Sequence, residues 1–321
     1  MKKTSIYLII FLQFLMNVTV ILNIIYVRQI FSFLFLTFGL GYLFLKTLNS
    51  NSNGLSFWEK ASFSLGLNLA LLMFIGLAVN EICPLIGFPY PLSTTILLMT
   101  INLISIPSYL YVLLRRKNLS FSLDNINSVY AALLLSSLPL LSIFGSLMVK
   151  SNQGNILLLV MLLVVATLIL LVSASQKIIP HSFYPIILFS VCLALLLPQR
   201  LVTNYVSGYD RHLEFYVFEL TQINSKWNST IPTLSSQLSK SNAMISVTIL
   251  PTILSEILGL NGELIFKVVF PLIFSFIPIV TYQLYCTQRD KKTAFLAVFF
   301  LASNLVSFGL GPNKQRIAQL F

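Results

Sequence analysis

Apolar runs of about 20 residues recur along the chain, and each is long enough to cross a bilayer as a helix. The run ILLLVMLLVVATLILLVSA (156–174) is one of them. The chain is 57% hydrophobic and 9% charged, against about 25% charged residues in a soluble domain. We therefore predict an all-α, polytopic transmembrane helical bundle. The nine expected spans lie near 5–26, 29–47, 62–80, 92–114, 127–149, 155–174, 181–198, 263–285 and 293–311.

The basic residues predict how the bundle is oriented. Cytoplasmic loops carry an excess of Lys and Arg. With a cytoplasmic amino terminus, the motifs RRK (115–117) and RDKK (289–292) fall inside, and Arg28, Lys150, Lys314 and Arg316 fall outside. The basic residues punctuate the apolar runs and form no stripe with interleaved aromatics, so the net charge of +11 does not indicate nucleic-acid binding. We expect a multi-pass protein of the cell membrane.

Three regions follow from this topology. Residues 1–198 form an amino-terminal transmembrane bundle of about seven helices, and 199–262 form a long extracytoplasmic loop. Residues 263–321 add two further transmembrane helices. In the loop we expect a helix over 209–221, an irregular polar stretch over 224–242, and a helix over 243–260 in the outer membrane interface.

Polar residues inside the spans are few. Single amides in a bilayer usually hydrogen-bond between helices. We expect this of Gln13, Asn17, Asn23, Asn68 and Asn102. Lys267 lies near the end of a span, from which its ammonium group can reach the membrane surface.

The stretch SGYDRHLEFY (207–216) concentrates charge in the long outer loop, although the chain has only nine Asp and Glu residues. On a helix, Asp210 and Glu214 share one face, along the edge of an apolar stripe made by Tyr209, Leu213, Tyr216, Val217 and Leu220. A partly desolvated carboxylate there suits general-base catalysis, or the pair with a histidine suits a divalent cation. The alternative is a solvated helix start, where Asp210 complements the helix dipole.

The same stretch, followed by SNAMISVTILPTILSEILGLNGELIFKVVFPLIFSFIPI (241–279) and PNKQRIAQLF (312–321), resembles an archaeal multi-pass membrane family, domain of unknown function 2206. Its members resemble membrane glycosyltransferases of the GT-C fold. The family continues beyond the position of Phe321, so the resemblance implies a carboxy-terminally truncated member.

This resemblance implies a reaction of the cell envelope. A GT-C enzyme takes a sugar from a polyprenyl-phosphate donor at the extracytoplasmic face and passes it to a glycan, lipid or protein acceptor. Asp210 matches the family's catalytic acid, and Glu214 is the second acid. Substrate-binding roles fall to Arg211, His212, Lys314 and Arg316. Asp210 and Glu214 are also the candidate ligands for a divalent cation, Mg²⁺ or Mn²⁺.

Two other functions stay open. A transporter of lipid-linked saccharide or a small solute would carry ionisable residues near the membrane midplane, and the spans contain almost none. A non-catalytic membrane scaffold or fragment would bind neither donor nor metal.

Overall fold

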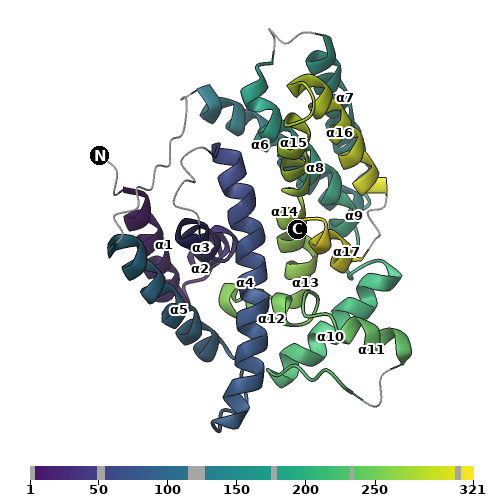
Figure 1. The fold of residues 1–321 in the computed structure, drawn as a ribbon. Helices are drawn as coiled ribbons and strands as arrows, with labels where there is room; N and C mark the ends of the chain where they lie inside the picture. Colours follow the sequence, from purple (N-terminus) through teal and green to yellow (C-terminus); the bar gives the residue numbers. More distant parts are fainter. Residues whose placement is uncertain (1–3, 49–54, 115–126, 175–178, 232–234, 308–311) are drawn as a thin grey trace. The chain divides into compact units, whose positions relative to one another are not determined.

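The computed structural model describes residues 4–48, 55–114, 127–174, 179–231, 235–307 and 312–321. All regular secondary structure in these residues is helical (Figure 1). The α-helices are α1 (Thr4–Ile21), α2 (Val27–Leu34), α3 (Leu40–Leu48), α4 (Phe57–Leu85), α5 (Thr94–Leu114), α6 (Asn127–Lys150), α7 (Ile156–Ala174), α8 (Tyr184–Leu196), α9 (Pro198–Leu201), α10 (Tyr209–Asn224), α11 (Ser236–Asn242), α12 (Ile249–Leu258), α13 (Gly262–Leu264), α14 (Phe270–Phe274), α15 (Ile277–Cys286), α16 (Lys291–Ser307) and α17 (Asn313–Ala318). Two π-helical turns, η1 (Phe35–Gly39) and η4 (Ile265–Val269), and a 3₁₀ turn, η3 (His181–Phe183), complete them.

Six helical segments among the described residues are long and apolar enough to cross a membrane. They are Val27–Leu48, Phe57–Leu85, Thr94–Leu114, Ile156–Ala174, His181–Leu201 and Gly262–Cys286. Each coincides with one of the expected spans, so an all-helical architecture with several candidate membrane spans is confirmed. The other three expected spans fall on α1, α6 and α16, and the total of nine stays a prediction.

Contacts divide the chain into two compact units. The first unit comprises residues 1–122, 212–265 and 321, and the second comprises 123–211 and 266–320. The helix α10 crosses from the second unit to the first between Arg211 and His212. The three regions expected from the sequence describe placement relative to a membrane, which contacts do not test, so they stay a prediction.

Close backbone packing joins α3 to α4 in the first unit. A Cβ added at Gly41 would collide with backbone atoms of Ser64 and Asn68. The side chain of Asn68 accepts a hydrogen bond from Gly41 N (2.8 Å) and donates one to the carbonyl oxygen of Leu36, within η1. A π-turn disturbs the regular helix ladder, and lipid supplies no alternative partners. Asn68 therefore supplies backbone partners around the π-turn, which confirms its expected interhelical bonding.

A polar ladder joins α1 to α5 in the same unit. Gln13 Nε2 donates to Asn102 Oδ1 (2.6 Å) and Ser105 Oγ (2.5 Å), and Tyr109 OH donates to Gln13 Oε1 (2.6 Å). Asn17 and Asn102 exchange amide hydrogen bonds of 2.8 and 3.1 Å. These bonds confirm the interhelical role expected of Gln13, Asn17 and Asn102.

The helix α12 is enclosed by protein. It contacts α2, α4 and α5, and the side chains of nine of its ten residues are buried. Pro251 lies in its first turn, where the missing N–H breaks no helical hydrogen bond. The sequence predicts an interfacial helix here, and such a helix leaves one face to water and headgroups. Because α12 has almost no exposed face, it packs as a core helix of this unit, and its depth in the membrane stays a prediction.

Arg28 fixes the carboxyl end of α12. Its guanidinium donates to the carbonyl oxygens of Ile257 (2.9 Å) and Glu256 (2.5 Å) and to Asn23 Oδ1 (2.6 Å). Cations at this end of a helix complement its dipole. Asn23 lies in the turn between α1 and α2, so its expected bonding between packed spans is wrong. Its positive φ of 50° instead marks the turn.

The loop after α10 is tied to the end of α4. Asn80 Nδ2 donates to Trp227 O (2.9 Å), Trp227 N donates to Asn80 Oδ1 (2.7 Å), and Trp227 Nε1 donates to Asn242 O (2.9 Å). The last of these partners ends α11, a short helix within the stretch that we expected to be irregular throughout. Its Ser- and Asn-rich sequence gave no apolar periodicity to indicate a helix.

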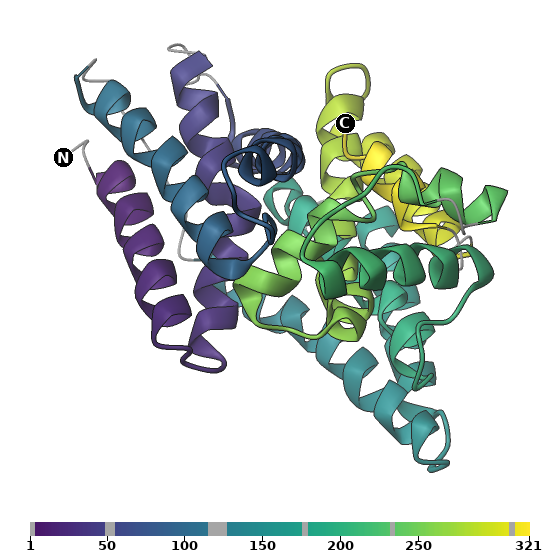
Figure 2. The ribbon, with the colours of Figure 1, turned by 90° about the horizontal axis from the view of Figure 1, so that it is seen from below.

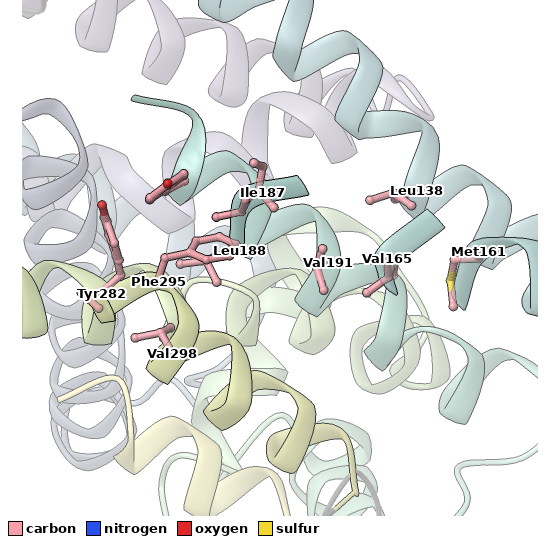
Figure 3. Close-up of a cluster of buried hydrophobic side chains, with 13 residues drawn as sticks. Leu138, Met161, Val165, Ile187, Leu188, Val191, Tyr282, Phe295 and Val298 are labelled. Atoms are coloured by element: carbon pink, nitrogen blue, oxygen red, sulfur yellow. The ribbon is translucent and has the colours of Figure 1, made fainter. Parts of the chain in front are cut away.

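The second unit has an apolar core, and Figures 2 and 3 show the helices that build it. Ile187, Leu188 and Val191 on α8 pack in one cluster with Phe295 and Val298 on α16. The remaining buried members come from α6, α7, α8, α15 and α16: Leu138, Met161, Val165, Val172, Tyr184, Ala194, Tyr282 and Ala294. In lipid, such close van der Waals packing is a main force that holds helices together.

Candidate anion-binding site

The acidic stretch forms the start of α10. Gly208, with φ of 106°, precedes the helix in a conformation that glycine adopts readily. Asp210 lies in the first turn, near the positive end of the helix dipole, and its side chain is exposed. His212 and Glu219 are exposed as well. The sequence suggested a partly desolvated carboxylate, whereas Asp210 is exposed, and its catalytic role stays a prediction.

The buried face of α10 differs from the predicted stripe. Arg211 and Glu214 are 1% and 0% exposed, and they share the buried face with Val217, Phe218 and Thr221. Tyr209 and Tyr216, which we assigned to the apolar stripe, are 69% and 47% exposed. Hydrophobic periodicity placed the aromatic residues inward, but the packing of α10 buries the charged residues instead.

The expected carboxylate pair is consequently split between two environments. Asp210 is exposed and Glu214 is fully buried. Among the residues that the structure describes, no group of three or more His, Cys, Asp and Glu side chains could hold a metal ion. The divalent cation stays a prediction without a ligand cluster to support it.

A second feature of the site is a cation cluster in the second unit, which we define as Arg200, Lys267 and Arg316 with Asn313 and the ring of Phe274. Arg200 donates to Phe266 O (2.6 Å) and Asn313 Oδ1 (3.0 Å). The guanidinium carbons of Arg200 and Arg316 lie 5.9 and 5.7 Å from the centre of the Phe274 ring. Both distances suit cation–π attraction.

Lys267 joins the cluster through the chain that follows α9. Its ammonium group donates to the carbonyl oxygens of Asn204 (2.5 Å) and Thr203 (3.3 Å), and the residue is 8% exposed. The side chain directs the ammonium group to the backbone of the exposed residues Thr203 and Asn204. Whether this position is at the membrane surface stays a prediction.

The charge balance of the second unit is strongly positive. Arg200, Arg211, Lys267 and Arg316 are all at least 92% buried, whereas the acids whose side chains the structure describes in this unit, Asp210 and Asp290, are exposed. Buried cations are costly without negative charge or hydrogen-bond acceptors. The hydrogen bonds given above go to neutral carbonyl and amide oxygens. The two guanidinium groups beside the Phe274 ring suit a phosphate-bearing ligand.

The sequence identified part of this cluster. It predicted Arg316 as a phosphate-binding cation, and Arg316 is a member. Lys314, also predicted, is partly exposed on α17. Arg200, Lys267 and Asn313 were missed. The sequence did contain a signal for them. Outer loops are poor in Lys and Arg, so a cation predicted at the outer end of a span is not explained by membrane topology and is a candidate for ligand binding.

Comparisons of the chain with protein-family models, with curated proteins and with solved structures found no match.

Proposed function

We propose that the protein is a membrane glycosyltransferase-like protein. It takes a sugar from a polyprenyl-phosphate donor and transfers it to a surface glycan, lipid or protein at the extracytoplasmic face. The observation that carries this proposal is the cation cluster, which lies in the same unit as the exposed carboxylate of Asp210. A reaction that releases a lipid phosphate needs both kinds of group.

Each group has a chemical role in this proposal. The acceptor oxygen attacks the anomeric carbon, and the bond from that carbon to the phosphate oxygen breaks with its electron pair left on the phosphate. Asp210 accepts the proton of the acceptor hydroxyl as general base. Arg200, Lys267 and Arg316 stabilise the negative charge on the departing phosphate.

Glu214 takes a different role from the one the resemblance implied. Its full burial keeps it from an acceptor hydroxyl, so proton transfer falls to Asp210 alone. We assign Glu214 to positioning the first turns of α10. It stands three residues after the buried Arg211, a spacing at which side chains on a helix are neighbours.

The test compares cell-surface glycans in four strains: wild type, a deletion of the gene, Asp210→Asn and Glu219→Gln. Glu219 is an exposed acid on the same helix and serves as the matched control. Deletion and Asp210→Asn should remove the same sugar from polysaccharide or glycoprotein, while Glu219→Gln should leave the composition unchanged.

The other outcomes separate the alternatives. If deletion removes a sugar and Asp210→Asn does not, the protein acts as a transporter or a scaffold, and Asp210 only complements the helix dipole. If deletion changes no glycan, the proposed reaction is wrong.

A further inference from the structure

An apolar groove lies in the first unit, whereas the cation cluster belongs to the second unit. The groove has a volume of about 490 Å³. The lining comes from α1, α2, η1, α3 and α4: Leu8, Ile9, Phe11, Leu12, Leu15, Phe31, Leu34, Phe38, Gly39, Tyr42, Phe57, Ala61 and Ser64. A volume of several hundred cubic ångströms suits a small ligand or one hydrocarbon chain.

The floor of the groove carries two hydroxyl groups. Tyr42 and Ser64 are 3% and 1% exposed. The hydroxyl of Ser64 is buried and has no hydrogen-bond partner in the structure. Buried hydroxyls are normally hydrogen-bonded, and a serine in a helix usually finds a partner in the preceding turn. An unsatisfied hydroxyl in the wall of a groove therefore points to a ligand with an acceptor atom.

Two buried lysines lie one helical turn from residues that line the groove. Lys46 follows Tyr42 by four residues on α3, and Lys60 precedes Ser64 by four residues on α4. Residues four apart lie on the same side of a helix, one turn or about 5.4 Å along its axis. Because α3 ends and α4 begins on the side predicted to be cytoplasmic, both steps lead from the groove toward the same membrane surface. Lys46 and Lys60 are 1% and 8% exposed.

The acid that precedes Lys60 in the sequence, Glu59, caps the start of α4. Glu59 forms a capping box with Ser56: its carboxylate accepts a hydrogen bond from Ser56 N (2.7 Å), and its N–H donates to Ser56 Oγ (3.3 Å). This pairing holds the carboxylate at the start of α4. From the apolar lining of the groove, the helices therefore lead first to the hydroxyl groups of Tyr42 and Ser64 and then to the ammonium groups of Lys46 and Lys60.

We propose that this groove binds one phospholipid with an anionic headgroup. One hydrocarbon chain fills the groove, the Ser64 hydroxyl donates to an oxygen of the glycerol linkage, and the phosphate lies by Lys46 and Lys60. Basic pockets between transmembrane helices on the cytoplasmic side recognise anionic lipid headgroups in this way. With the predicted orientation, the lipid belongs to the cytoplasmic leaflet. The proposal goes beyond sugar transfer and holds whatever reaction the protein performs.

The test uses tryptophan fluorescence of the purified full chain in mixed micelles. Trp58 packs edge-on against Phe57, a groove residue, with ring centres 5.1 Å apart. The chain has two tryptophans, so Trp227→Phe leaves Trp58 as the single reporter. Dibrominated phosphatidylglycerol should quench Trp58 at lower mole fraction than dibrominated phosphatidylcholine. Each lysine should contribute about fivefold to this preference, as one charge near an anionic lipid does.

Three variants locate the binding. Lys60→Gln should reduce the preference for phosphatidylglycerol about fivefold, and Lys46→Gln with Lys60→Gln should abolish it. Lys291→Gln, an exposed lysine at a loop predicted to be cytoplasmic, should change nothing. Ala61→Phe fills the groove and should weaken quenching by both lipids.

A further measurement uses the protein with both lysines intact, so its result does not depend on whether a variant folds. Raising the salt concentration should leave most of the phosphatidylglycerol preference in place, because salt screens buried charges such as Lys46 and Lys60 much less than exposed ones. Equal quenching by the two lipids at low salt would overturn the proposal in favour of a groove filled by any lipid chain. A preference that Lys291→Gln reduces as much as Lys60→Gln would overturn it in favour of non-specific surface charge.

Discussion

At the scale of single residues, the two arginines beside Phe274 define the chemistry of the second unit. Arg200 uses two nitrogens of its guanidinium group to bind Phe266 O and Asn313 Oδ1, a forked geometry that lysine cannot reproduce. Arg316 lies against the same ring and is 4% exposed. An anion that forms charge-assisted hydrogen bonds with these two guanidinium groups should stabilise the protein.

This argument predicts a stabilising effect of pyrophosphate. At a concentration about a hundredfold above its dissociation constant, a ligand specific for the folded state stabilises it by about 2.7 kcal/mol. We expect pyrophosphate to raise the melting temperature of the wild-type protein, and Arg316→Gln to lose most of this increase. Thermal unfolding in detergent measures both.

The matched control is Arg289→Gln, which removes an exposed arginine and should keep the full increase. An equal increase in all three proteins would mean that pyrophosphate acts through ionic strength and does not bind the cluster.

At the scale of helices, the π-turn η1 shows how one side chain stabilises a span. The segment Val27–Leu48 is one continuous candidate span, yet its middle departs from the α-helical ladder. Asn68 reaches across from α4 to a carbonyl oxygen and an amide of this region. Gly41 allows the close approach that makes these bonds reachable.

Replacing Asn68 should therefore destabilise the first unit. Asn68→Leu keeps the volume but leaves the backbone groups at Leu36 and Gly41 without these partners, which costs about 1–3 kcal/mol when such groups are buried. Unfolding by titration with sodium dodecyl sulfate measures the loss.

Asn224→Ala is the control, because Asn224 is exposed and bonds only to a carbonyl of its own helix, Leu220 O (2.7 Å). If the two variants unfold at the same detergent fraction, the bonds of Asn68 do not stabilise the π-turn.

The start of α16 predicts a pH dependence. The hydrogen bond from Thr293 N to Asp290 Oδ2 (3.0 Å) lowers the pKa of Asp290 below its ordinary value of 3.8. A carboxylate with a lowered pKa in the folded state stabilises that state above its ordinary pKa, and the stabilisation is lost as the pH falls through the lowered pKa. Fraying of α16 should thus increase below about pH 4.

Asp290→Asn is the informative variant, since asparagine caps a helix without titrating. Hydrogen exchange of residues 293–296, corrected for the intrinsic rate, should lose its pH-dependent component in this variant. An unchanged component would show that another group titrates.

At the scale of the whole molecule, the orientation in the membrane is open to direct measurement. We expect the loop around α11 to face outward and the turn at Lys291 to face the cytoplasm. In a protein with Cys83, Cys192 and Cys286 replaced by alanine, a membrane-impermeant maleimide applied to intact cells should label Ser236→Cys and spare Lys291→Cys. Both positions are exposed.

Labelling of both sites after the cells are permeabilised is the control for reactivity. Labelling of Lys291→Cys alone in intact cells would invert the predicted orientation. The proposed outer-face reaction would then have to take place in the cytoplasm.

Helix positions followed from sequence because apolar runs in lipid must satisfy their own backbone hydrogen bonds. The expected span 29–47 matches Val27–Leu48, and 92–114 matches Thr94–Leu114. The expected span 62–80 was too short, since the capping box begins α4 at Phe57 and the helix continues to Leu85 through Pro84. Hydropathy alone detects the membrane-spanning part of such a helix and not its polar ends.

The site was only partly readable. Local spacing on one helix identified the exposed Asp210, which complements the dipole of α10 by its position in the first turn. The buried face of α10, with Arg211 and Glu214, depends on which neighbours pack there, and periodicity chose a different face.

The sequence by itself determined an all-helical chain with multi-pass character, because hydrophobic length and backbone bonding are local properties. Only the tertiary structure decided which groups Arg200, Lys267 and Arg316 contact. They come from α9, η4 and α17, which are far apart in the chain, and their bonds to Phe266 O, Asn204 O and the face of Phe274 form only when those segments pack together. Long-range packing leaves no spacing rule in a single sequence, so the sequence could point to single cations such as Arg316 but not to their shared surroundings.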